Sequence, residues 1–165
     1  MKRFTSLVLA LLCPLILQAE TLTGRVVKVI DGDTVTLLDA SKIQHKIRLA
    51  GIDAPESKQP YGQKSKEALS ALVAGQQVEV DWHKRDRYGR VVGKIIAGVR
   101  DVNLAQVRAG MAWWYRKYAN EQSPVDQRLY KDAEAKAKQA SVGLWSGKNP
   151  IPPWEWRKSG TGTQP

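Results

Sequence analysis

The chain has 165 residues, a length that suits a single domain, and its 26 Lys and Arg against 16 Asp and Glu give a formal net charge of +10. Its single cysteine, Cys13, excludes a scaffold stapled by internal disulfides. So basic a chain favours a polyanionic partner such as nucleic acid, an anionic membrane surface or an acidic glycan. A basic surface that serves only solubility is the simpler alternative.

Residues 1–19 have the layout of a secretory signal peptide. Lys2 and Arg3 precede an apolar run from Leu7 to Leu17, and Ala19 offers a small residue for cleavage. The run has 11 residues, whereas a membrane-spanning helix needs roughly 20. We therefore expect an exported protein, periplasmic or secreted, with no stable membrane insertion after cleavage. An uncleaved anchor is the alternative.

The segment from Thr21 to Ala50 is rich in β-branched residues that alternate with polar ones, which predicts three antiparallel strands. DGDT at 31–34 is an Asp-Gly turn signal between the first two strands. Residues 62–75 then carry apolar side chains at helical spacing, and Gly75 ends the predicted helix.

Two more strands and two more helices follow, predicted at 76–82, 90–97, 102–110 and 123–143, with a polar connection at 83–89 between the strands. Five short strands with a helix after the third are typical of the OB-type barrel. We therefore predict an α+β protein, a five-stranded OB-type β-barrel with three α-helices, over residues 20–148. In the tail, 149–165, we expect Trp154 and Trp156 to fold back onto the barrel.

Charged residues gather where the predicted strands begin and end. They lie in VIDGDTV (29–35), RLAGIDAPE (48–56) and DRYGR (86–90), and include Asp33, Arg48, Asp53, Glu56 and Arg90. The ends of neighbouring strands can meet even when they are distant in sequence, so we expect these side chains to lie close together.

A cluster made of hard carboxylate oxygens suits Ca²⁺ or Mg²⁺ and not a zinc site, and neither His45 nor His83 has ligand spacing with another His or Cys. Two arginines opposite a metal ion would neutralise the charge of a phosphodiester transition state, and Glu56 could position or deprotonate water. Each segment taken alone also fits a turn, a solvated strand end or a basic hairpin tip. Spacing alone therefore leaves both interpretations open.

Five segments together resemble the staphylococcal (micrococcal) nuclease family in order and spacing: VIDGDTV, IRLAGIDAPE, QPYGQKSKEAL, DRYGRVVGKI and VNLAQVRAGMAWWY. The resemblance covers residues 22–145. It implies a monomeric enzyme that hydrolyses DNA and RNA in the presence of Ca²⁺, with little sequence specificity and a preference for single strands. The products would carry 3′-phosphate ends.

The resemblance also implies roles for single residues. Asp33 and Asp53 would bind Ca²⁺ together with the backbone carbonyl of Ala54, which stands where some members have threonine. Glu56 would be the general base, Arg48 and Arg90 would bind the scissile phosphate, and Tyr88 and Tyr118 would lie near the nucleotide. Arg116 replaces a family aromatic, a departure that bears on base preference.

Two other functions compete with the nuclease. A catalytically inactive OB-fold protein that binds nucleic acid would keep the fold without the chemistry. A basic exported protein that binds envelope polyanions would explain the charge but not the carboxylates. Both predict binding that is independent of metal, whereas the enzyme predicts cleavage that depends on it.

Overall fold

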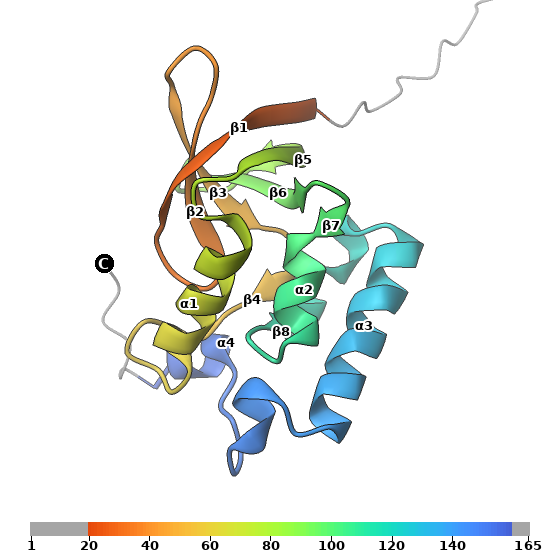
Figure 1. Cartoon of the computed structure of the whole chain (residues 1–165). Coiled ribbons are helices and arrows are strands. Elements are labelled where there is room, and N and C mark those ends of the chain that lie inside the picture. The colour runs from red at the N-terminus through yellow and green to blue at the C-terminus, as the bar shows by residue number, and fades with distance from the viewer. Residues whose placement is uncertain (1–19, 160–165) are drawn as a thin grey trace, which may run out of the picture.

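A computed structural model describes residues 20–159 of the chain (Figure 1). The predicted signal peptide, 1–19, and the end of the tail, 160–165, lie outside the described residues. Between residues 20 and 159, no helix is both long enough and apolar enough to cross a membrane.

Five strands close into a barrel. They are β1 (Glu20–Val29), β2 (Thr34–Leu38), β3 (Gln44–Leu49), β5 (Gln77–Arg85) and β6 (Val91–Ala97). The order is β3-β2-β1-β5-β6 with antiparallel neighbours, and β3 also pairs in parallel with β6, which closes the sheet. The predicted five-stranded OB-type barrel is confirmed.

Three helices lie together at one side of the barrel, at the predicted places in the chain (Figure 1). They are α1 (Gly62–Val73), α2 (Val102–Arg108) and α3 (Pro124–Gln139). The hydroxyl of Ser123 accepts a hydrogen bond from the backbone N–H of Asp126 and caps α3, while Pro124 takes the first helical position.

Several short elements were not predicted. They are the two-residue strands β4 (Ile52–Asp53), β7 (Arg100–Asp101) and β8 (Trp113–Trp114), the 3₁₀ turns Arg116–Glu121 and Gly143–Ser146, and a short helix α4 (Pro153–Trp156) in the tail. Such short elements lack a repeat that a sequence pattern could reveal.

The connection predicted at 83–89 is shorter than expected. Strand β5 continues to Arg85, which pairs with Val91, and only Asp86 to Arg90 form the turn. The pairing register shifts between Trp82 and Lys84. The side chains of His83 and Arg85 are exposed there, so a basic sequence is compatible with the strand.

A buried glutamate on α3 fixes the position of β8. The Glu134 carboxylate accepts hydrogen bonds from the backbone N–H of Trp114 (3.1 Å), from Arg116 (2.6 Å) and from Lys138 (2.9 Å). Strand β8 pairs in turn with β4, with Trp113 opposite Asp53. Helix α3 therefore helps to position a strand that carries one of the predicted site residues.

Asn103 on α2 joins the helix to the closure of the barrel. Its amide donates to the carbonyls of Ala50 (3.0 Å) and Gly93 (3.1 Å), and its Oδ1 accepts from the N–H of Ile95 (3.1 Å). The side chain is completely buried. It satisfies backbone groups where β3 ends beside β6, groups that would otherwise be buried without partners.

Replacing this amide should destabilise the barrel. We expect Asn103→Ala to lower the free energy of unfolding by about 2–4 kcal/mol, because a buried polar group left unpaired costs about 1–3 kcal/mol. Asn120→Ala, at an exposed position, is the matched control. Urea denaturation measures both variants, and equal stability of the two would contradict the role of Asn103.

Candidate active site

The turn between β1 and β2 presents Asp33. The Asp31 carboxylate accepts a hydrogen bond from the backbone N–H of Asp33 (3.0 Å), which tightens the turn. The backbone carbonyl of Asp33 accepts from the N–H of Leu49 (2.8 Å), and Thr34 pairs with Arg48. The antiparallel register of β2 and β3 therefore brings Asp33 and Arg48 side by side.

Helices α1 and α2 both contact this β1–β2 turn. A Cβ atom on Gly32 would lie 1.9 Å from the Ser65 hydroxyl of α1, so glycine alone fits at this position. From α2, the Gln106 amide donates to the carbonyls of Gly32 (2.9 Å) and Ser65 (3.0 Å). Sequence analysis missed Gln106, because an isolated glutamine in a helical pattern carries no signal of its partners.

Arg48 is the centre of the site. Its Nη2 lies 3.1 Å from an Asp33 carboxylate oxygen and 2.9 Å from one of Asp53. Its Nη1 donates to the backbone carbonyls of Leu49 (2.8 Å) and Ile52 (3.0 Å), so one guanidinium spans the turn between β3 and β4. Burial lowers the pKa of Arg48, but Asp33 and Asp53 raise it by more, which keeps the guanidinium charged.

The segment after β3 presents Asp53 at the same place. Gly51, with φ +72°, allows the chain to turn from β3 into β4. The backbone N–H of Ala54 donates to Asp33 (2.7 Å), which ties the two aspartates through the backbone as well as through Arg48. The Asp53 side chain is 1% exposed. Burial raises its pKa, and the charge of Arg48 partly offsets this rise.

Glu56 lies on the loop that leads to α1. Its backbone N–H donates to the Gln59 side chain (3.1 Å), and its carbonyl accepts from the Gln59 N–H (2.8 Å), so the loop conformation is defined. The carboxylate is 37% exposed and reaches the cluster through a third arginine. Arg157 lies 2.6 Å from Glu56 and 2.7 Å from Asp53.

Arg157 was missed by sequence analysis. The return of the tail to the barrel was predicted from its tryptophans, and Trp154 does stack on Tyr115, with ring centroids 5.3 Å apart and an interplanar angle of 4°. Nothing in the pattern PPWEWR indicated that the arginine after Trp156 would reach two carboxylates about a hundred residues away in the chain.

Arg90 stands apart from the carboxylate cluster. Its Nε donates to Asp86 (2.7 Å) within the β5–β6 turn. It lies two residues before Val92, the residue of β6 that pairs with Arg48. Tyr88 is 61% exposed, and the guanidinium of Arg90 lies 5.5 Å from the centre of its ring.

Tyr118 belongs to an aromatic and basic surface beside the site. It packs edge-on against Tyr115, with centroids 5.0 Å apart, and the ammonium of Lys84 lies 5.2 Å from its ring. Arg116, at the position of a family aromatic, binds Glu134 and lies over Trp114 at 5.1 Å. Its guanidinium is thus engaged by α3.

The acidic cluster has the donor chemistry for a hard divalent cation. Asp33 and Asp53 converge on one nitrogen of Arg48, and carboxylate oxygens are the ligands that Ca²⁺ prefers. Burial and the neighbouring Asp33 raise the pKa of Asp31 to about 7, so its ionised form would gain from an added cation. Across residues 20–159, no group of three or more His, Cys, Asp or Glu side chains is placed to hold a metal ion. Backbone carbonyls and water would have to complete the coordination.

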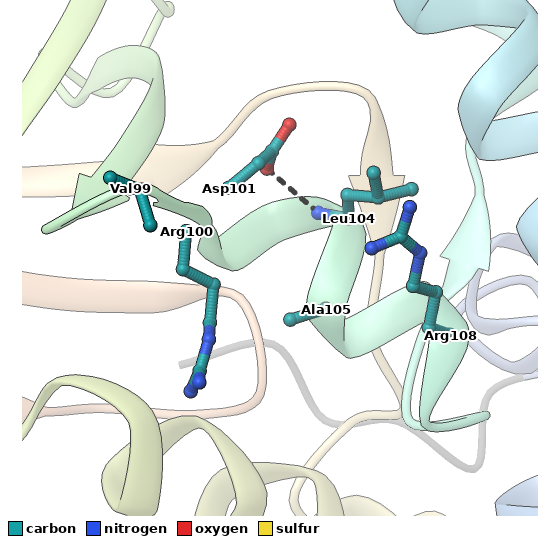
Figure 2. A pocket seen from close by; sticks show the side chains of 6 residues that line it. All are labelled: Val99, Arg100, Asp101, Leu104, Ala105 and Arg108. Carbon is teal, nitrogen blue, oxygen red and sulfur yellow. Dashed lines mark hydrogen bonds between the residues drawn. The ribbon is translucent and has the colours of Figure 1, made fainter.

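A separate hollow of about 430 Å³ lies between β7 and α2, away from this cluster (Figure 2). Its lining comprises Val99, Arg100, Asp101, Leu104, Ala105 and Arg108. Asp101 is engaged by the N–H of Leu104 (2.9 Å), shown as the dashed line, and by the Tyr130 hydroxyl (3.0 Å). The hollow brings together no group of side chains suited to catalysis.

Comparison with known proteins identifies the family of the chain. The family model described as "Staphylococcal nuclease homologue" matches residues 46–147. An uncharacterized endonuclease of Escherichia coli is 44% identical over 158 residues, which cover 95% of this chain and 98% of the relative. A micrococcal nuclease of Shigella flexneri is 37% identical over 82% of this chain and 80% of its own length.

A plant protein named for the same family also matches this chain. A staphylococcal-like nuclease of Arabidopsis thaliana is 42% identical over 118 residues, which cover 71% of this chain and 34% of the plant protein. The family model spans more than half of the chain, and the Escherichia coli relative covers 95% of it. The chain therefore belongs to the staphylococcal nuclease family and is a nuclease, an enzyme that hydrolyses phosphodiester bonds.

Proposed function

We propose that this nuclease hydrolyses DNA and RNA in a Ca²⁺-dependent reaction, with little sequence specificity, a preference for single strands and products that end in 3′-phosphate. The observation that carries the proposal is the convergence of Asp33 and Asp53 on Arg48, with Glu56 beside them. This arrangement combines oxygen donors for a cation, a guanidinium for a phosphate and a carboxylate for water.

The cation would be held by Asp33 and Asp53, with the carbonyl of Ala54 as a backbone ligand. When bound there, Ca²⁺ supplies Lewis-acid polarisation of a phosphoryl oxygen. Phosphate binding and proton transfer are the work of side chains of the protein itself.

Two arginines are suited to bind the scissile phosphate. Arg90 is held by Asp86 through Nε, and its two terminal nitrogens have no acceptor among residues 20–159, so they are free to donate to a phosphate. Arg48 lies deeper and provides fixed positive charge next to the carboxylates. Charges fixed in this way stabilise the additional negative charge of a pentacoordinate phosphorus without reorganising.

Glu56 is the candidate general base. Gln59 fixes its backbone, while the carboxylate is exposed enough to meet water. Glu56 would accept a proton as the water oxygen attacks phosphorus. The bond from phosphorus to the 5′-oxygen then breaks, that oxygen takes a proton from solvent water, and the phosphate stays on the 3′ side.

The surface around the site suits a single strand. Tyr118 and Tyr88 offer partly exposed rings beside Lys84, Arg87 and Arg90, and a base stacked on such a ring gains about 1–3 kcal/mol. The inactive nucleic-acid-binding protein is not favoured, because every charged residue expected for catalysis is present. We further propose that the enzyme is exported, periplasmic or secreted, on the strength of residues 1–19, and that it is a monomer, as is usual in this family.

Metal dependence is the first property to measure. The purified protein should cleave single-stranded DNA when Ca²⁺ is added, lose this activity in a calcium chelator and recover it when Ca²⁺ is restored. Analysis of the product ends should find 3′-phosphate. Tight binding without cleavage, indifferent to metal, would contradict the proposal and favour a binding protein.

Removing the base should separate turnover from binding. We expect Glu56→Gln, which keeps an acceptor for Arg157, to lower kcat by about 10²- to 10⁴-fold with little change in affinity for DNA, because general-base catalysis contributes factors of this size. Glu67→Gln on the exposed side of α1 is the matched control. Steady-state kinetics with binding measured in parallel test this, and wild-type turnover of Glu56→Gln would overturn the role.

Arg48 should not tolerate lysine. We expect Arg48→Lys to reduce kcat/KM by about 10²- to 10³-fold, because an ammonium is a point charge without the planar fork that spans the carboxylates and the turn. Lys46→Arg, two residues earlier on β3 and exposed, is the control. Thermal denaturation of the same samples distinguishes a catalytic effect from unfolding, and near-wild-type activity of Arg48→Lys would contradict this assignment.

A further inference from the structure

The C-terminal segment, residues 150–159, docks firmly beside the active site. Pro153 is buried, Trp154 stacks on Tyr115, and the Gln59 side chain donates to the carbonyl of Ile151. Tyr115 is itself tied to the β3–β4 turn, because its N–H donates to the carbonyl of Gly51 (2.9 Å). In Figure 1, α4 lies next to α1, beside the segment that leads from the end of β4 to α1.

This docking delivers a guanidinium to two carboxylates. Arg157 Nη2 lies 2.7 Å from Asp53 Oδ2, and Nη1 lies 2.6 Å from Glu56 Oε1 and 3.4 Å from Asp53 Oδ1. Arg48 approaches the same Asp53 Oδ1 at 2.9 Å. Each oxygen of the Asp53 carboxylate therefore has a guanidinium partner.

The two guanidinium groups on Asp53 differ in how easily they can leave. Arg48 has 14% of its side chain exposed, and it binds two backbone carbonyls as well as two aspartates. Arg157 is 32% exposed, and its partners within residues 20–159 are carboxylates alone. It also follows a helix of only four residues. Arg157 is thus the guanidinium that an added cation can displace more easily from Asp53.

The balance of charge in the site also singles out Arg157. Within residues 20–159, Asp33, Asp53 and Glu56 form ion pairs only with Arg48 and Arg157. Asp31 forms no ion pair there and is joined to the cluster by its hydrogen bond from the backbone N–H of Asp33. A divalent cation bound to Asp53 would supply the positive charge that Arg157 supplies now. Two cations that need the same carboxylate oxygens compete for them.

We propose that Arg157 is an additional active-site residue that sets the cation affinity of the nuclease by competing for the Asp53 carboxylate. The inference rests on the metal site of the proposed function. Cation binding displaces Arg157 from Asp53, while the Nη1 contact keeps the guanidinium on Glu56 and so positions that carboxylate. Apparent cation affinity is then reduced by the fraction of molecules in which Arg157 occupies Asp53.

Calcium binding to the metal-free full chain tests this directly. We expect isothermal titration calorimetry at constant ionic strength to give an affinity about tenfold tighter in Arg157→Gln than in the wild type, since partly exposed ion pairs compete only modestly. Arg157→Lys, which keeps the charge without the fork, should fall between them. Lys158→Gln removes the same charge from the adjacent, exposed residue and should bind Ca²⁺ like the wild type.

Thermal denaturation supplies a second readout. Without Ca²⁺, Arg157→Gln should melt below the wild type, because Glu56 loses its ion-pair partner and Asp53 keeps only Arg48. Saturating Ca²⁺ should then raise its Tm by more than it raises that of the wild type. An equal or weaker affinity in Arg157→Gln would overturn the competition and leave the metal site intact. Failure of all the proteins to bind Ca²⁺ would instead overturn the metal site, and this inference with it.

Discussion

The site depends on one buried guanidinium shared between two aspartates. Arg48 pairs with Asp33 and Asp53 while it binds the carbonyls of Leu49 and Ile52, so one side chain closes a turn and holds two carboxylates together. Removing such charges from water is costly, and the cost is offset only when each has a partner with good geometry. An arginine suits this position because its planar fork can satisfy acceptors in two directions at once.

Polar side chains from the helices hold the loops that carry these acids. Gln106 on α2 binds the turn before β2, Asn103 binds the end of β3, and Glu134 on α3 binds β8, the partner of β4. All three are buried. The barrel thus supplies the strand register, and the helices keep the short irregular segments in place. Catalytic groups on such segments need this support, because displacement of a reacting group by about 1 Å can cost about 100-fold in rate.

The C-terminal segment, residues 150–159, contributes side chains to the active site. The family match ends at residue 147, yet Trp154 extends the aromatic surface of Tyr115 and Tyr118, and Arg157 enters the carboxylate cluster. A segment that lies outside the barrel therefore contributes charge to its most acidic point. The arrangement links the position of residues 150–159 to the charge balance of the site.

The sequence by itself determined the barrel, its three main helices and the meeting of Asp33 with Arg48 and Asp53. Period-two alternation marks strands, and consecutive antiparallel strands pair as neighbours, so the start of β2, the end of β3 and the segment after it meet without any long-range information. Only the tertiary structure decided that Arg90 pairs with Asp86, that Gln106 holds the β1–β2 turn and that Arg157 reaches Asp53 and Glu56. These contacts depend on which rotamer a side chain adopts and where a helix or a tail packs. Packing is a property of the whole fold, and no local repeat in the chain encodes it.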